Sequence, residues 1–120
     1  MLKEDFRLKK NSSFKATYSQ KRIASDEFFL LYGGKTKENP EYSTKIGFVV
    51  SKKIHKRAVK RNRIKRLARE AVRLSLNNND EFHKFQSLIF MAKEGALDLD
   101  FEKARLSVTK LINKLARKFI

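Results

Sequence analysis

Short apolar runs alternate with turn-forming residues along this chain, and four of them predict strands. The clearest is Phe28–Tyr32, which Gly33 and Gly34 end, and residues 35–43 then have the composition of a loop. The predicted strands cover residues 21–24, 27–33, 44–51 and 86–92.

Three other segments show the spacing of amphipathic helices. Residues 11–19 place Phe14 and Tyr18 one turn apart on the same face. Three polar residues are available to cap this helix: Asn11, Ser12 and Ser13. A long helix is predicted from Lys56 or Arg57 to Leu76, where residues 77–80 end it. Its expected apolar stripe consists of Val59, Ile64, Leu67, Ala71 and Leu74.

Gly95 breaks the chain after the fourth strand, and a last helix is expected beyond it. Asp98 or Asp100 can cap this helix. Its apolar residues repeat at helical spacing: Phe101, Ala104, Val108, Leu111, Leu115 and Phe119.

The predicted order of elements is helix, three strands, helix, strand, helix. It favours an α/β (α+β) two-layer sandwich in which helices cover a four-stranded sheet, with a β-α-β unit in residues 44–92. No internal repeat or linker divides the chain, so residues 1–120 are expected to form a single domain.

Charge narrows the choice of partner. The chain has 29 Lys and Arg against 13 Asp and Glu, a formal net charge of +16. Such an imbalance opposes compaction, and a polyanion is the simplest partner that offsets it. No run approaches the roughly 18 apolar residues of a membrane span, and no signal-peptide core follows Met1. Because Cys is absent, disulfides and thiolate metal sites are excluded. We therefore expect a cytoplasmic protein that binds nucleic acid rather than a membrane.

The basic residues concentrate on the predicted long helix. Residues 52–73 contain eleven Lys or Arg and one Glu. At 100° per residue, Arg61, Lys65 and Arg69 form one ridge. Three further polar residues lie beside it: Asn62, Arg66 and Arg73. A merely solvated helix face usually mixes charges of both signs, so this one favours a surface for phosphates.

Aromatic residues beside cations supply a second candidate surface. Phe14 and Tyr18 are flanked by lysines and Arg22, and Tyr32 ends a strand. Such rings can stack on the bases of single-stranded nucleic acid. Core packing stays an open alternative for Phe14, and is less expected for the two tyrosines because their hydroxyls favour a wet edge.

The residues offer no catalytic or metal centre. His55 and His83 are far apart in sequence, and neither has a metal-ligand spacing. Acidic residues do not cluster with them, and a glycine-rich phosphate loop is absent. We therefore expect no catalytic residues and no metal ligands in this chain.

Several passages resemble the bacterial ribonuclease P protein component. They are Phe6–Lys10 followed by Phe14 and Tyr18, Gly47–Lys53, Arg61–Glu70, and Ala92–Ala96. The resemblance extends from about residue 6 to residue 118, and its Arg-Asn-Arg core is quite specific. His55 stands where many members have Gly, so the turn before the long helix departs from the common pattern.

The resemblance implies a subunit that binds a catalytic RNA, with one protein per RNA, while that RNA removes the 5′ leader of precursor tRNA with Mg²⁺. It implies a left-handed β-α-β crossover, whereas such crossovers are right-handed in nearly all proteins. The residues implied to face the RNA are Arg61, Asn62, Arg63, Lys65, Arg66 and Arg69. Those implied for the leader cleft are Phe14, Tyr18 and Tyr32, with Lys52 and Lys53 assigned there on weaker grounds.

Two other hypotheses stay open at this point. A ribosomal or RNA-chaperone protein would have a similar size and charge, so composition does not separate it from the first hypothesis. A free-standing protein nuclease is disfavoured by the missing acid-base or metal constellation.

Overall fold

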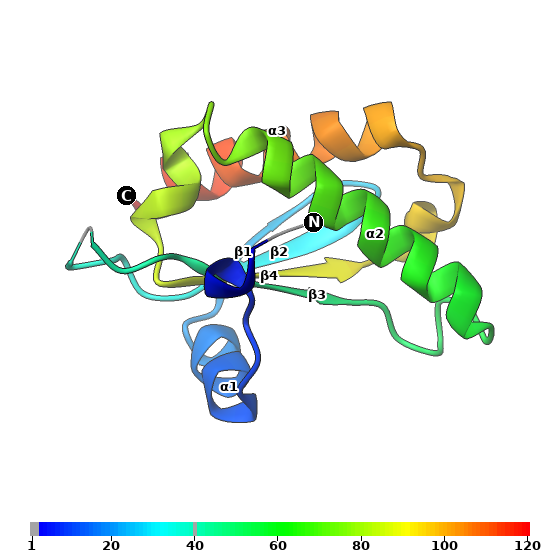
Figure 1. Ribbon diagram of the computed structural model, residues 1–120, viewed down its shortest axis with the longest axis horizontal. Coiled ribbons are helices and arrows are strands. Elements are labelled where there is room, and N and C mark those ends of the chain that lie inside the picture. Colours follow the sequence, from blue (N-terminus) through cyan, green and yellow to red (C-terminus); the bar gives the residue numbers. More distant parts are fainter. Residues whose placement is uncertain (1–2, 40) are drawn as a thin grey trace.

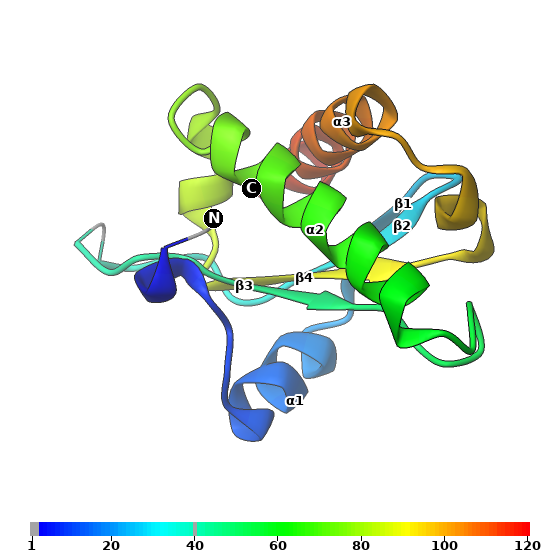
Figure 2. The ribbon, with the colours of Figure 1, turned by 45° about the vertical axis from the view of Figure 1, so that its right-hand side comes forward.

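The computed structural model describes residues 3–39 and 41–120. A sheet of four strands lies at the centre, with two long helices, α2 (Ala58–Ser75) and α3 (Phe101–Phe119), on one side. The short helix α1 (Asn11–Ser19) lies on the other side (Figures 1 and 2). The predicted order of helices and strands is confirmed, and the sandwich of sheet and helices gains a partial third layer from α1.

The strands are β1 (Arg22–Ser25), β2 (Phe29–Gly33), β3 (Lys45–Val49) and β4 (Ser87–Ala92), arranged in the order β1-β2-β4-β3. β1 and β4 each pair with β2 in antiparallel register, whereas β3 runs parallel to β4. β3 and β4 therefore flank α2 in the expected β-α-β unit. β1 and β3 are the two edge strands, and α2 lies over the β3 side while α3 packs on β1 and β2.

The main core lies between the sheet and helices α2 and α3. Alternate residues of β2 and β4 point into it, among them Leu31, Leu88 and Phe90, all at most 1% exposed. From α3 come the predicted positions Ala104, Val108, Leu111 and Leu115, all fully buried. Phe101 and Phe119 of the same predicted set are not buried, since they lie at the two ends of the helix.

The apolar stripe predicted for α2 is wrong in part. Val59 is 77% exposed and Leu74 is 43% exposed, whereas Ile64 and Ala71 are buried as expected. Val59 belongs to the first turn of α2, and this turn projects beyond the sheet (Figure 1). The buried side of α2 consists of Ile64, Ala68, Ala71, Val72 and Ser75. Small residues on this side let α2 and α3 approach closely.

Helix caps follow the prediction at one end of the chain only. Asp100 caps α3, since its carboxylate accepts a hydrogen bond from the Lys103 amide at 2.8 Å. The predicted caps of α1 are wrong, because the helix begins at Asn11 and its N-cap is Lys10, which makes no side-chain cap. Three 3₁₀ helices were not predicted from the sequence: Glu4–Phe6, Asp80–Lys84 and Glu94–Asp98.

Candidate nucleic-acid interface

The polar side of α2 presents cations and one amide to solvent. Asn62, Arg63 and Arg66 are exposed, while Arg61, Lys65 and Arg69 are half-buried along the border of the helix. These six residues are called the α2 basic face below. Arg73, expected beside them, instead forms a salt bridge of 2.5 Å with Glu70, and its hydrogen bond lowers the pKa of the Glu70 carboxyl. The one acidic residue of this helix is therefore neutralised locally.

Arg61 binds backbone as well as facing solvent. Its Nη1 donates to the carbonyl oxygens of His55 at 2.9 Å and Lys56 at 2.7 Å. In the same turn, Nδ1 of His55 accepts a hydrogen bond of 3.0 Å from the Arg57 amide. Arg57 is the N-cap of α2 and makes no side-chain cap of its own. Arg61 and His55 thus fix the turn that leads into α2, which gives His55 a structural role.

Arg69 connects the α2 basic face with the edge of the sheet. Its guanidinium carbon lies 6.0 Å from the centroid of the Phe48 ring, which in turn stacks on Phe90 at 5.7 Å. A pocket of about 300 Å³ opens beside this pair, between α2 and the start of the chain. Its wall includes Arg7, Lys9, Phe14, Gly47, Phe48 and Arg69. The pocket joins the cations of α2 to the aromatic residues on the opposite side of β3.

Phe14, Tyr18 and Tyr32 form one aromatic cluster on the face of the sheet that α1 covers. The Tyr18 and Tyr32 rings meet edge to face with centroids 4.8 Å apart, and Phe14 lies 6.5 Å from Tyr18. All three side chains are half-buried. Burial raises the pKa of the Tyr18 phenol, and the nearby Tyr32 adds to that rise. The cluster therefore keeps neutral, partly accessible rings, as a stacking surface requires.

Two anchors place α1, and with it the cluster, on the sheet. The buried Thr17 hydroxyl lies 2.5 Å from the hydroxyl of Ser87 on β4. Phe14 packs directly over Gly47, where an added Cβ would lie 2.8 Å from the ring. Glycine at 47 is therefore needed for this close approach. The open alternative of core packing applies in part to Phe14, which is half-buried and packs against Gly47.

The remaining candidates lie apart from the cluster. Lys52 and Lys53 are exposed in the turn between β3 and α2, at the end of the molecule beyond the sheet, whereas α1 lies under its middle (Figure 1). His83 lies elsewhere again, with Nε2 donating to the Leu76 carbonyl at 2.8 Å and its ring against Phe6. Lys52 and Lys53 thus lie in the turn that leads into α2, and no ring of the aromatic cluster comes from that turn.

Two basic groups were missed from the sequence. Arg7 and Lys9 belong to the passage Phe6–Lys10, for which the sequence predicts no binding role. In the structure a parallel bridge from Arg7 to Ile46 holds this segment against β3. The exposed side of α3 also carries cations that its apolar periodicity concealed. Sequence spacing identifies a face of one helix, but it does not show which segments lie beside it.

Within residues 3–39 and 41–120, no three His, Cys, Asp or Glu side chains are grouped as metal ligands would be. None of the helices in that part of the chain is long and apolar enough to span a membrane.

Fold and surface together define a small, basic α+β protein with an aromatic cluster opposite its two long helices. The chain belongs to the Ribonuclease P family, whose model matches residues 2–116. This membership places the chain in tRNA processing, as part of a ribonucleoprotein.

Relatives and solved structures agree with the family. The ribonuclease P protein component of Bacillus velezensis is 36% identical over 114 residues, 94% of this chain and 91% of its own length. That of Clostridium kluyveri is 34% identical over 112 residues, 91% of this chain and 93% of its own length. The Staphylococcus aureus RNase P protein superposes with a TM-score of 0.75 at 28% identity, covering 96% of this chain and 98% of that one. The Thermotoga maritima protein, with a TM-score of 0.73 at 21% identity over 92% and 96% of the two chains, shares the fold.

Proposed function

We propose that this chain is the protein subunit of a ribonuclease P holoenzyme and that it binds two RNAs with two surfaces. The α2 basic face holds the catalytic RNA, and the aromatic cluster holds the single-stranded 5′ leader of precursor tRNA. The observation that carries this proposal is the arrangement of the two surfaces on opposite sides of β3, joined by the pocket beside Arg69 and Phe14.

The α2 basic face has the chemistry of a surface for structured RNA. The planar guanidinium of arginine donates two parallel hydrogen bonds to a phosphate or a base edge. The Asn62 amide can both donate and accept hydrogen bonds. Arg63 and Arg66 are exposed, and the guanidinium of Arg69 lies over the Phe48 ring. Preorganised cations of this kind lose little conformational entropy when they bind.

The aromatic cluster has the chemistry of a surface for unpaired bases. A single strand offers ring faces that stack on Phe14, Tyr18 or Tyr32, whereas paired bases in a duplex do not. Arg7 and Lys9 line the same pocket as Phe14, and their cationic side chains can contact the phosphates of such a strand. A leader passing here would reach the α2 basic face across the edge of β3.

The chemistry of cleavage is assigned to the RNA subunit. Within residues 3–39 and 41–120, no three His, Cys, Asp or Glu side chains are grouped as ligands of a metal ion would be, and the family resemblance implies that the RNA carries out the Mg²⁺-dependent hydrolysis. The protein's part is to bind and orient the substrate. We accordingly propose one protein per catalytic RNA, acting in the cytoplasm.

Replacing one tyrosine at a time tests this assignment in the reconstituted holoenzyme. Tyr18→Ala or Tyr32→Ala should weaken binding of precursor tRNA by about 1–3 kcal/mol for each stacked base, roughly 5- to 150-fold. Binding of mature tRNA and of the catalytic RNA should stay nearly unchanged, because neither has a leader. The measurement is a pair of binding titrations, with leader-bearing and leaderless tRNA, for each variant.

The chain offers a matched control in its third tyrosine. Tyr42 is 70% exposed in the loop before β3, so Tyr42→Ala should leave both affinities unchanged. Tyr18→Phe keeps the ring and should keep the preference for the leader. Thermal melts must show that each variant is folded. Folded Tyr18→Ala and Tyr32→Ala proteins with an undiminished leader preference would rule the aromatic cluster out as the leader site.

A further inference from the structure

A second cationic surface lies on α3, apart from α2. Four basic residues repeat at helical spacing along its solvent side: Lys110, Lys114, Arg117 and Lys118. All four are exposed, and they are called the α3 stripe below. No acidic residue follows Glu102 in the chain, so no carboxylate of this helix neutralises the stripe. It extends over about 12 Å, or two helical turns.

The stripe borders the free edge of the sheet, where β1 adds another cation. Nζ of Lys114 donates to the Ser25 carbonyl at 3.0 Å, which fixes the helix beside β1. The guanidinium carbon of Arg22 lies 5.8 Å from the centroid of the Phe119 ring, and Nζ of Lys118 lies 5.5 Å from it. Arg22 and the stripe therefore form one surface of five cations.

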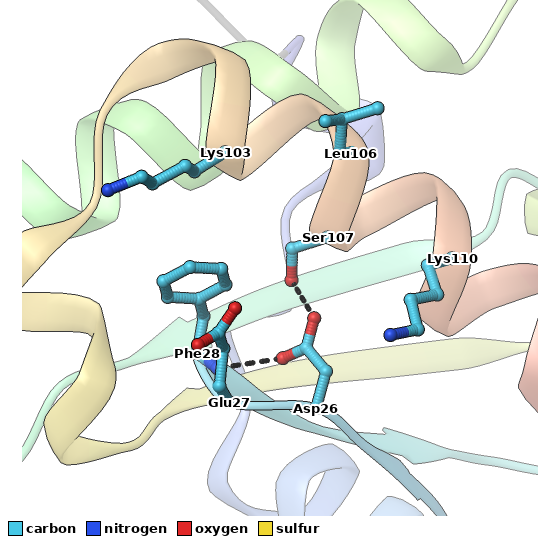
Figure 3. A pocket seen from close by; sticks show the side chains of 7 residues that line it. All are labelled: Asp26, Glu27, Phe28, Lys103, Leu106, Ser107 and Lys110. Carbon is cyan, nitrogen blue, oxygen red and sulfur yellow. Dashed lines mark hydrogen bonds between the residues drawn. The ribbon is translucent and has the colours of Figure 1, made fainter.

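One end of this surface has a clear boundary. Beyond Lys110 lies a pocket of about 350 Å³ bordered by the carboxylates of Asp26 and Glu27 (Figure 3). Asp26 is held in place, since it accepts hydrogen bonds from the Ser107 hydroxyl at 2.5 Å and the Phe28 amide at 2.8 Å. Lys103 and Lys110 line the same pocket, and the Lys110 side chain points toward Asp26 (Figure 3), so Lys114, Arg117 and Lys118 are the stripe residues that lie outside this acidic pocket.

The location of this surface separates it from the two surfaces of the proposed function. β1 and β3 are opposite edges of the sheet, about 14 Å apart across three strand spacings. The α3 stripe follows β1, whereas α2 lies over β3. α1, which carries Phe14 and Tyr18 of the aromatic cluster, lies on the other face of the sheet (Figure 2).

We infer that the α3 stripe and Arg22 bind the phosphate backbone of a base-paired segment of the catalytic RNA, distinct from the segment on α2. This inference rests on the proposed function. Arg22, Lys114, Arg117 and Lys118 lie outside the pocket that Asp26 and Glu27 border, and such a group of cations fits a polyanion. The surface has no stacking platform, because Phe119 is its nearest ring and both cations beside it use that ring. Double-stranded RNA is bound through its phosphates without stacking, which this surface matches. The catalytic RNA is the expected source, since α2 and α3 lie on the same side of the sheet and the leader cluster lies on the other.

Salt dependence of binding tests the inference with two matched double variants. Arg117→Gln/Lys118→Gln removes one Lys and one Arg from the stripe, both outside the pocket that Asp26 borders. The control, Lys84→Gln/Arg105→Gln, removes the same charges from residues already paired with Glu81 at 2.8 Å and Glu102 at 2.5 Å. In titrations of the catalytic RNA, the stripe variant should lower the salt slope by about two units, and the control should not. Between 50 and 200 mM salt the stripe variant should lose roughly tenfold less affinity than the native protein.

A crosslinking arm identifies which RNA is bound. The chain contains no Cys, so Lys110→Cys provides a single site for a photoactivated label in the holoenzyme with precursor tRNA. The expected product joins the protein to the catalytic RNA. Crosslinks to tRNA alone, or equal salt slopes for the two double variants, would overturn the inference.

Arg66→Ala in the same titrations distinguishes failure of the inference about α3 from failure of the proposed function. If native protein binds the catalytic RNA and Arg66→Ala weakens it while the stripe variant does not, only the inference about α3 is wrong. If native protein does not bind this RNA, the proposed function is wrong.

Discussion

Individual residues of the α2 basic face have different structural roles, although their spacing in the sequence assigns them all to one cationic surface. Arg66 is exposed and available for phosphate, whereas Arg61 donates two hydrogen bonds to the turn before the helix. Nη1 of Arg61 is committed to those carbonyls, and only the rest of the guanidinium faces outward. A helical wheel assigns both residues to one surface, but it does not show that one of them also supports the backbone.

Arg61→Ala should therefore destabilise the free protein, and Arg63→Ala should not. Loss of two charge-assisted hydrogen bonds at a partly exposed site should cost about 1–2 kcal/mol of unfolding free energy. Arg63 is exposed and serves as the matched control, with the same residue type on the same helix. The measurement is urea denaturation without RNA. Equal unfolding midpoints for the two variants would show that Arg61 does not support the turn.

At the scale of the elements, the N-cap of α3 shows which of two candidate aspartates the helix uses. Asp100 has the spacing and chemistry of an N-cap, and it caps α3 through the Lys103 amide. Asp98, the other candidate from the sequence, is exposed in the 3₁₀ helix before it. A capping carboxylate satisfies a backbone donor that has no partner within its helix.

Asp100→Ala should lower the free energy of unfolding by about 0.5–2 kcal/mol, because α3 loses its cap. Asp98→Ala removes the same charge two residues earlier and should change that free energy by less than about 0.5 kcal/mol. Denaturant unfolding of both variants decides the matter. If the two aspartates prove equally important, the cap contributes nothing beyond its charge.

Most elements were predictable from the sequence, since their apolar spacing is local. The strands and helices lie within a few residues of the predicted ranges, and the parallel β3–β4 pair follows from the helix between them. The buried side of α2 was not predictable, because Val59 and Leu74 look like core residues until the position of α3 is known. Periodicity reports which residues could be buried, whereas the neighbouring helix decides which are.

In the candidate site, too, some features were predictable from the sequence and others depend on tertiary contacts. A family resemblance implied that Phe14, Tyr18 and Tyr32 line one cleft, and in the structure the Tyr18 ring lies beside Tyr32 and Phe14, while leader binding by these rings stays a prediction. The contribution of Arg7 and Lys9 depends on a bridge between residues 7 and 46, which no spacing reveals. Contacts between segments far apart in sequence are the part that required the structure.

At the scale of the whole molecule, charge is the dominant feature. A net charge of +16 on 120 residues opposes the compact state, most strongly at low ionic strength. Two cationic surfaces, on α2 and α3, bring like charges together on one side of the sheet. An anion bound to the folded chain should therefore stabilise it by more than simple screening does.

Millimolar sulfate or phosphate should raise the melting temperature more than chloride of equal ionic strength. A tenfold excess of anion over its Kd adds about 1.4 kcal/mol of stability, which corresponds to several degrees in a domain of this size. Thermal melts followed by circular dichroism at matched ionic strength provide the test. Identical curves in sulfate and chloride would mean that screening alone is at work.

Cleavage of precursor tRNA tests the central claim most directly. Precursor tRNA labelled at its 5′ end is incubated with Mg²⁺ and either the purified protein, the catalytic RNA of a related ribonuclease P, or both. We predict that protein alone releases no leader, and that the two components together release it faster than the RNA alone, because the protein binds and orients the substrate. Release of the leader by the protein alone, or no acceleration of the RNA by folded protein, would contradict this account.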